Sequence, residues 1–103
     1  MILEIAILNI RAGEEAAFEE AVAKGSPLIV RTPGYISHEL RRCLETKGRY
    51  ALLVRWETLE SHTVAFRESE SFPAWRAIIG PHFASSPLVE HYESAGEWPA
   101  PQG

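Results

Sequence analysis

Residues 56–83 read WETLESHTVAFRESESFPAWRAIIGPHF, and this stretch predicts two short amphipathic helices. If Thr58 caps the first helix, then Leu59, His62 and Phe66 recur at helical spacing on one face. That face should be buried, so the spacing places an ionisable imidazole where hydrocarbon is expected. His62 is therefore either a core histidine whose hydrogen bonds are satisfied inside the fold or a residue of a binding pocket.

The second helix, predicted over 72–79, ends at a Gly-Pro pair. Packed against the first helix, it should enclose a space with aromatic walls and two imidazoles near the rim. The aromatic residues are Phe66, Phe72, Trp75 and Phe83, and the imidazoles are those of His62 and His82. An apolar cavity with a few polar groups suits a flat aromatic ligand, although aromatic residues at helical spacing also form ordinary cores.

The rest of the chain supplies strands and one longer helix. Apolar runs predict strands at 2–10, 35–45, 49–57 and 87–94, the middle two forming a hairpin. A helix begins after Gly13, and Gly25-Ser26-Pro27 is expected to interrupt it. The order strand, helix, strand, strand, helix pair, strand is that of the ferredoxin-like split βαβ fold, in the α+β class. Helices then cover one face of an antiparallel sheet.

The opposite face of this sheet needs a cover as well. Its first and third strands carry large apolar residues, so that face cannot be mostly polar. A second copy of the sheet is the simplest cover, which predicts a homodimer. We expect residues 1–95 to form the domain and 96–103 to form a tail that exchanges with the partner. Trp98 would anchor that exchange, the alternative being a frayed terminus.

Composition excludes several classes of function. A chain of 103 residues holds one domain, and its 10 basic against 14 acidic side chains argue against nucleic-acid binding. Cys43 is the single cysteine, so no intrachain disulfide can form and a reducing compartment is expected. The N-terminal run lacks the basic region and cleavage site of a signal peptide, and no segment approaches the roughly 20 apolar residues of a membrane span. These features predict a cytoplasmic protein without membrane partners.

The four histidines do not have the spacing of a metal site. None of His38, His62, His82 and His91 has a second histidine four residues away, and Cys43 has no soft ligand near it in sequence. We therefore expect no bound metal. The chain also has no Rossmann glycine pattern, P-loop or Ser-His-Asp order, so nicotinamide, nucleotide and acyl-transfer enzymes have no support.

The stretch 56–83, together with a last strand reading PLVEHYE, resembles the antibiotic biosynthesis monooxygenase domain family. The resemblance extends from Met1 to about Glu93. It implies a dimeric α/β barrel, in which two sheets pack face to face and the tail often reaches the partner. Members of the family include cofactor-free oxygenases of polycyclic phenols, quinol oxygenases, heme-degrading enzymes and proteins with no assigned activity.

The resemblance implies a chemistry that uses neither metal nor flavin. A phenol or hydroquinone loses a proton, its anion passes an electron to dioxygen, and the resulting peroxide loses water to leave a quinone. The substrate would lie between the helices and the sheet, where His62 would take the proton and His82 or Arg67 would hold the oxyanion. The ring would contact the four predicted wall residues. The alternative is a non-catalytic dimer that binds a small molecule.

The heme-degrading branch of the family can be tested residue by residue. Its members have an Asn on the first strand, a Trp on the first covering helix and a His ligand on the next. These positions fall on Ala6, Phe66 and Arg76 here, and Asn9 is three residues out of register. We therefore expect no heme and no other cofactor.

Overall fold

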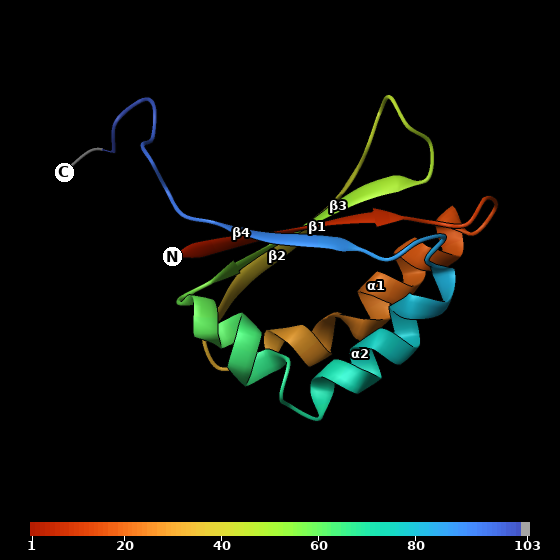
Figure 1. Cartoon of the computed structure of the whole chain (residues 1–103), viewed down its shortest axis with the longest axis horizontal. Helices are drawn as coiled ribbons and strands as arrows, with labels where there is room; N and C mark the ends of the chain where they lie inside the picture. The colour runs from red at the N-terminus through yellow and green to blue at the C-terminus, as the bar shows by residue number, and fades with distance from the viewer. Residues whose placement is uncertain (102–103) are drawn as a thin grey trace.

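The computed structural model describes residues 1–101 and shows one antiparallel sheet with helices on one of its faces (Figure 1). The strand order is β2-β3-β1-β4. The strands are β1 (Ile2–Asn9), β2 (Tyr35–Arg42), β3 (Arg49–Trp56) and β4 (Leu88–Tyr92). The main helices are α1 (Glu15–Val30) and α2 (Ser71–Ile79). This confirms the predicted ferredoxin-like α+β fold.

The core lies between the sheet and the two main helices. Strand alternation turns every second residue of β1 and β3 toward the helices, and those residues are the buried ones. Phe18 and Ile29 of α1 and Trp75 of α2 close the core from the other side. On β1 the buried positions include one acid, Glu4, in phase with Ala6 and Leu8.

Helix α1 corrects one prediction, because Gly25-Ser26-Pro27 does not interrupt it. The helix runs unbroken through Pro27 to Val30. An internal proline costs a helix about 3 kcal/mol, but Val22 before it and Ile29 after it are both buried in the core. Gly25 also lets α2 approach closely, since a Cβ there would lie 2.8 Å from the Trp75 ring. Tertiary packing therefore outweighs the local breaker.

The segment after β3 begins as predicted and then widens. The Thr58 hydroxyl accepts a hydrogen bond from the Ser61 backbone N–H at 3.2 Å, as a capping residue does. The following helix becomes the π-helix η1 (Ser61–Phe66), in which the Arg67 N–H bonds to the His62 carbonyl, five residues back. His62 and Phe66 are buried, whereas Leu59 is 41% exposed, so the prediction that Leu59 faces the core was wrong.

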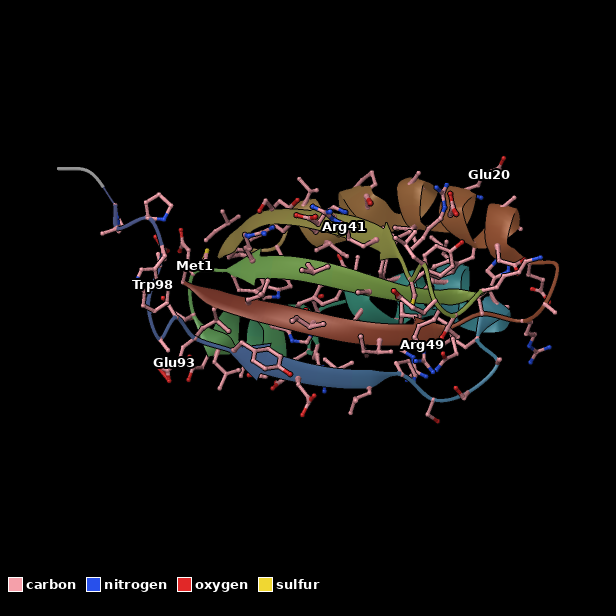
Figure 2. The ribbon with its side chains drawn as sticks, turned by 90° about the horizontal axis from the view of Figure 1, so that it is seen from above. Met1, Glu20, Arg41, Arg49, Glu93 and Trp98 are labelled. Atoms are coloured by element: carbon pink, nitrogen blue, oxygen red, sulfur yellow. The ribbon has the colours of Figure 1, made fainter. Side chains whose placement is uncertain are left out.

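The other face of the sheet has no cover within the described chain, as Figure 2 shows from above. Strand pairing gathers its apolar residues in the middle. They are Leu3, Ile5, Ile7, Leu53, Leu88 and Tyr92, which we call the outer patch. The tail leaves the sheet beyond β4, and its Trp98 is 85% exposed. The predicted 96–103 tail ends with residues 102–103, which lie outside the described residues.

A separate point concerns membranes. No helix in the described part of the chain has both the length and the apolar character that a membrane crossing requires.

Candidate functional site

A cavity of about 320 Å³ lies between the helix-covered face of the sheet and the helices η1 and α2. Most of its wall is apolar, with side chains from β1, β3, α1 and β4. The structure brings six of the seven residues predicted for the site to this cavity. They are His62, Phe66, Arg67, Phe72, Trp75 and Phe83. Two predicted helices and the sheet thus meet at the space that the sequence indicated.

His82 is the predicted site residue that does not reach this cavity. It ends the short 3₁₀ helix η2 (Gly80–His82), which continues directly from α2. This turn carries the imidazole toward the start of α1, where His82 Nδ1 lies 2.9 Å from Glu14 Oε1 and the ring packs edge-on to Phe18. Its place is therefore at the end of the molecule near the β1–α1 turn, outside the cavity wall.

Glu4 is a cavity residue that the sequence reasoning missed. Its side chain is buried, and its Oε1 accepts a hydrogen bond from Trp56 Nε1 at 3.0 Å. The same oxygen lies 3.4 Å from His62 Nε2. The other carboxyl oxygen, Oε2, has no hydrogen-bond partner in residues 1–101. Every fully enclosed side-chain N or O atom in that range has a partner, so Oε2 is not fully enclosed. Because Glu4 helps to form the cavity wall, we infer that Oε2 faces the cavity.

His62 is held on three sides. Its ring stacks on Trp56, with centroids 5.3 Å apart and planes 17° from parallel. Its Nδ1 lies 2.7 Å from His91 Nε2, so one of these two nitrogens donates a hydrogen bond to the other. Antiparallel pairing of β1 with β4 sets His91 directly opposite Glu4. Glu4, His62 and His91 thus form a continuous polar chain, which we call the acid–imidazole chain.

Burial controls the charge of this chain. It raises the pKa of Glu4, against the opposing effects of the Trp56 hydrogen bond and the positive charge of Arg67. It lowers the pKa of His62 to about 3, and Arg67 and His91 act in the same direction. It also lowers the pKa of His91. At neutral pH the two imidazoles are therefore uncharged, and the Glu4 carboxyl group is the member of the chain best placed to take or give a proton at the cavity.

The acid–imidazole chain does not have the geometry of a metal site. His62 turns one ring nitrogen toward Glu4 and the other toward His91, so the three side chains do not converge on one point. Within residues 1–101 no three His, Cys, Asp or Glu side chains are grouped as a metal ion would require.

Together, the fold and the cavity define a small ferredoxin-like α+β protein with a ligand-sized space beneath its helices. The model of the antibiotic biosynthesis monooxygenase family matches residues 1–78, and the chain belongs to this family. It is 42% identical to the uncharacterized protein YczJ of Bacillus subtilis (strain 168) over 93 residues, which cover 90% of this chain and 98% of that protein.

Solved structures agree with this assignment. A crystal structure from Bordetella bronchiseptica, which carries the family's name, is 41% identical, with a TM-score of 0.89 over 91% of this chain and 96% of that one. SnoaB of Streptomyces nogalater, titled a cofactor-independent oxygenase, is 17% identical, with a TM-score of 0.81 over 95% of this chain and 96% of its own. At that identity, the likeness to SnoaB shows the fold alone.

Proposed function

We propose that this protein is a cofactor-independent monooxygenase that oxidises a small phenol or hydroquinone with dioxygen inside the cavity. One observation carries the proposal: a carboxyl group with an open oxygen, backed by two imidazoles, lies in the wall of an otherwise aromatic and aliphatic space. The volume of about 320 Å³ is near the lower end of the range of ligand pockets, about 300–1,000 Å³. Family membership supports the reaction type.

The reaction asks three things of the protein. A proton must leave the substrate hydroxyl, the resulting anion must be stabilised until it passes an electron to dioxygen, and bulk water must be kept away. Recombination of the radical pair gives a peroxide, and loss of one water molecule leaves the quinone. Overall, one phenol and one dioxygen become one quinone and one water. A hydroquinone, which already carries the second oxygen, becomes a hydroxyquinone and one water in the same way.

The residues divide these tasks by position. Glu4 Oε2 accepts the proton, and His62, whose Nε2 lies 3.4 Å from Oε1, holds the carboxyl group in position. Arg67 lines the same cavity and supplies positive charge for the developing oxyanion. Phe66, Phe72, Trp75 and Phe83 contact the ring. His82 has no part in this proposal, because it does not line the cavity.

The test is oxygen uptake by the purified protein with a panel of hydroquinones and anthrone-type phenols, without added metal or flavin. We expect stoichiometric loss of dioxygen and formation of the quinone, at a rate that depends on the protein. Phe72→Ala, which removes a wall residue without touching the acid–imidazole chain, should change the preference within the panel. Rates equal to buffer for every member of the panel would contradict the proposal.

A second function, non-catalytic binding of a small aromatic molecule, has an observation in its favour. Both ring nitrogens of His62 already face a protein partner, which is what a structural histidine shows. The two functions predict different results for the His62→Ala variant. If His62 takes part in catalysis, this variant loses turnover but keeps ligand affinity. If His62 is structural, the variant melts at a lower temperature, while turnover or binding stays normal in the fraction that is folded.

We also propose that the protein is a homodimer, with the outer patch of each chain packed on that of the other. The patch is apolar across three neighbouring strands, and the exposed Trp98 lies beyond its edge on the tail (Figure 2). We expect a dimeric mass by light scattering at micromolar concentration. Removal of residues 96–103 should weaken the dimer by about 2 kcal/mol or more if Trp98 is an anchor. A monomeric mass for the full chain would contradict this assembly.

A further inference from the structure

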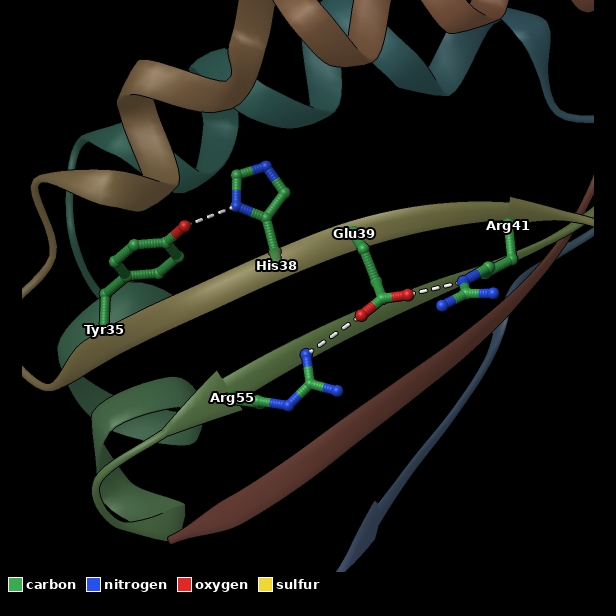
Figure 3. Close-up of polar contacts among 5 residues, drawn as sticks. All are labelled: Tyr35, His38, Glu39, Arg41 and Arg55. Carbon is green, nitrogen blue, oxygen red and sulfur yellow. Dashed lines mark hydrogen bonds and ion pairs between the residues drawn. The ribbon is translucent and has the colours of Figure 1, made fainter.

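Two arginines, Arg67 and Arg76, have no side-chain partner among residues 1–101, whereas the other six arginines do. In residues 1–101, six arginine side chains donate a hydrogen bond to a carboxylate, an amide, a hydroxyl or a backbone carbonyl. They are Arg11, Arg31, Arg41, Arg42, Arg49 and Arg55. Figure 3 shows one such arrangement, with Glu39 between Arg41 and Arg55. Arg67 and Arg76 have no hydrogen bond or ion pair within the same residues.

These two unpaired arginines line the same cavity. Arg67 directly follows η1 and Arg76 lies on α2, and both residues are exposed, which places them at the mouth. Arg76 lies over the Phe72 ring, 5.9 Å from its centroid, and this contact holds the guanidinium beside the aromatic wall. The chain has 14 acidic side chains, yet within residues 1–101 none of them pairs with the two guanidiniums at the cavity mouth.

The other charged groups at the cavity do not neutralise them. Among the residues that form its wall, Glu4 of β1 is the single carboxyl group, so one carboxylate at most stands against two guanidiniums. Glu68 and Glu70, which flank Ser69 between the helices, are exposed and do not line the cavity. The wall contributions of α1, β3 and β4 are uncharged. The cavity therefore carries an excess of positive charge at its mouth.

We propose that the ligand of this cavity is an aromatic carboxylate, whose carboxylate group is bound by Arg67 and Arg76 at the mouth while its ring enters the aromatic space. The planar guanidinium matches a carboxylate with two parallel hydrogen bonds. The orientation of the reacting hydroxyl toward Glu4 rests on the proposed function, but the binding of the anion does not. This inference narrows the substrate class from phenols in general to hydroxylated aromatic acids.

The test measures binding and needs no turnover. Two matched probes are 1-hydroxy-2-naphthoate and 1-hydroxy-2-naphthamide, which differ in the charge of one substituent. Their affinities are measured anaerobically on the full-length protein, by calorimetry or by quenching of Trp75 and Trp56 fluorescence. We expect the carboxylate to bind at least tenfold tighter than the amide at low salt, and this preference to shrink as salt screens the arginines.

Variants show which residues produce the preference for the carboxylate over the amide. Arg67→Gln and Arg76→Gln should each weaken carboxylate binding by about fivefold to tenfold, and the double variant should bind the acid and the amide alike. Lys24→Gln, which removes one exposed positive charge from α1, is the matched control and should leave both affinities unchanged. Circular dichroism of each variant checks the fold.

The inference is overturned if the amide binds as tightly as the acid, if the double variant keeps the preference, or if neither probe binds at millimolar concentration. Its failure differs from failure of the proposed function. Arginine-dependent binding without oxygen uptake would leave a carboxylate-binding protein that is not an oxygenase, whereas oxygen uptake with neutral hydroquinones alone would leave an oxygenase with a different ligand.

Discussion

The protein contains two histidine–carboxylate pairs built from the same residue types in different surroundings. His62 and Glu4 have side chains that are 4% and 8% exposed and lie at the cavity wall. His82 and Glu14 have side chains that are 20% and 39% exposed and lie near the β1–α1 turn, 2.9 Å apart. The surface pair has the shorter contact. In the buried pair, burial raises the pKa of Glu4 and lowers the pKa of His62.

The pairs differ in burial, and burial is the largest cause of the raised pKa of Glu4. Water can solvate either member of the surface pair, so the loss of one member costs little stability. The buried pair has no such substitute, because Glu4 depends on Trp56 and His62, and His62 depends on His91 and Glu4. A buried acid beside an apolar cavity is also the arrangement that tunes a proton acceptor toward neutral pH.

The largest expected difference between the two pairs is in turnover, when the acid of each pair is replaced in turn. Glu4→Gln keeps an acceptor for Trp56 Nε1 but cannot take a proton, so turnover of a hydroquinone should fall by about 10²-fold or more, the usual scale for a general base. Glu14→Gln should leave turnover within about twofold. Both rates are measured by oxygen electrode at saturating substrate. Equal rates in the two variants would remove the distinction between the pairs.

Replacing the histidine of each pair should lower the free energy of unfolding by different amounts. His62→Ala leaves His91 without its hydrogen-bond partner, leaves Glu4 with Trp56 alone, and opens space beside Trp56. These losses should cost about 1 to 3 kcal/mol of unfolding free energy. His82→Ala removes a contact at the surface and should cost about 0.5 kcal/mol or less. Urea titration at fixed protein concentration measures both. A larger loss at His82 than at His62 would contradict the assignment of the buried pair as the interdependent one.

The pH dependence of stability should show the buried imidazole directly. The pKa of His62 in the folded protein is about 3, below the ordinary value of 6.5 that it has in the unfolded chain. The unfolded chain therefore binds the proton first, and stability is lost as pH falls from about 6.5 toward 3. Between pH 7 and pH 5 the wild-type protein should lose more unfolding free energy than His62→Gln does. Parallel stability curves for the two proteins over this range would show that folding does not lower the pKa of His62.

The smallest effect concerns the hydrogen bond that orients Glu4. Trp56→Phe keeps an aromatic ring under His62 but removes the N–H that reaches Glu4 Oε1, which alone should cost about 1 kcal/mol. The smaller ring also leaves space in the core, which adds to that loss. Because that N–H favours the ionised carboxyl group, the acidic limb of the pH–rate profile should move to higher pH. An unmoved limb would mean that Glu4 is not the group that titrates.

Much of the fold was readable from the chain because its strands alternate cleanly. Tyr50, Leu52, Val54 and Trp56 all occur on the buried face of β3, and the hairpin and helix order followed from the turns between such segments. Pro27 was misleading because a local breaker says nothing of the packing on either side of it. That α1 continues depends on contacts with α2, which lies more than forty residues further along the chain.

The sequence predicted the apolar part of the site, but of its polar part only His62 and Arg67. Helical spacing identified the aromatic wall, since the residues that form it repeat along two short helices. Glu4 could have been found from its phase with Ala6 and Leu8, which puts an acid on the buried face of a strand. His91 could not, because its place opposite Glu4 depends on the register of β1 with β4. His82 failed because a 3₁₀ turn redirected it.

The widened turn of η1 has a consequence for chain length. In an α-helix, residues five positions apart point about 140° away from each other, but the π-helical closure between the His62 carbonyl and the Arg67 N–H brings such residues nearly into line. That is how His62 and Arg67 come to line one cavity. Deleting the exposed Val64 would leave the imidazole and the cation four positions apart, about 40° from each other on an ordinary α-helix, so both would stay on one face. The wide turn therefore accommodates one extra residue in this segment without moving the two groups to different faces.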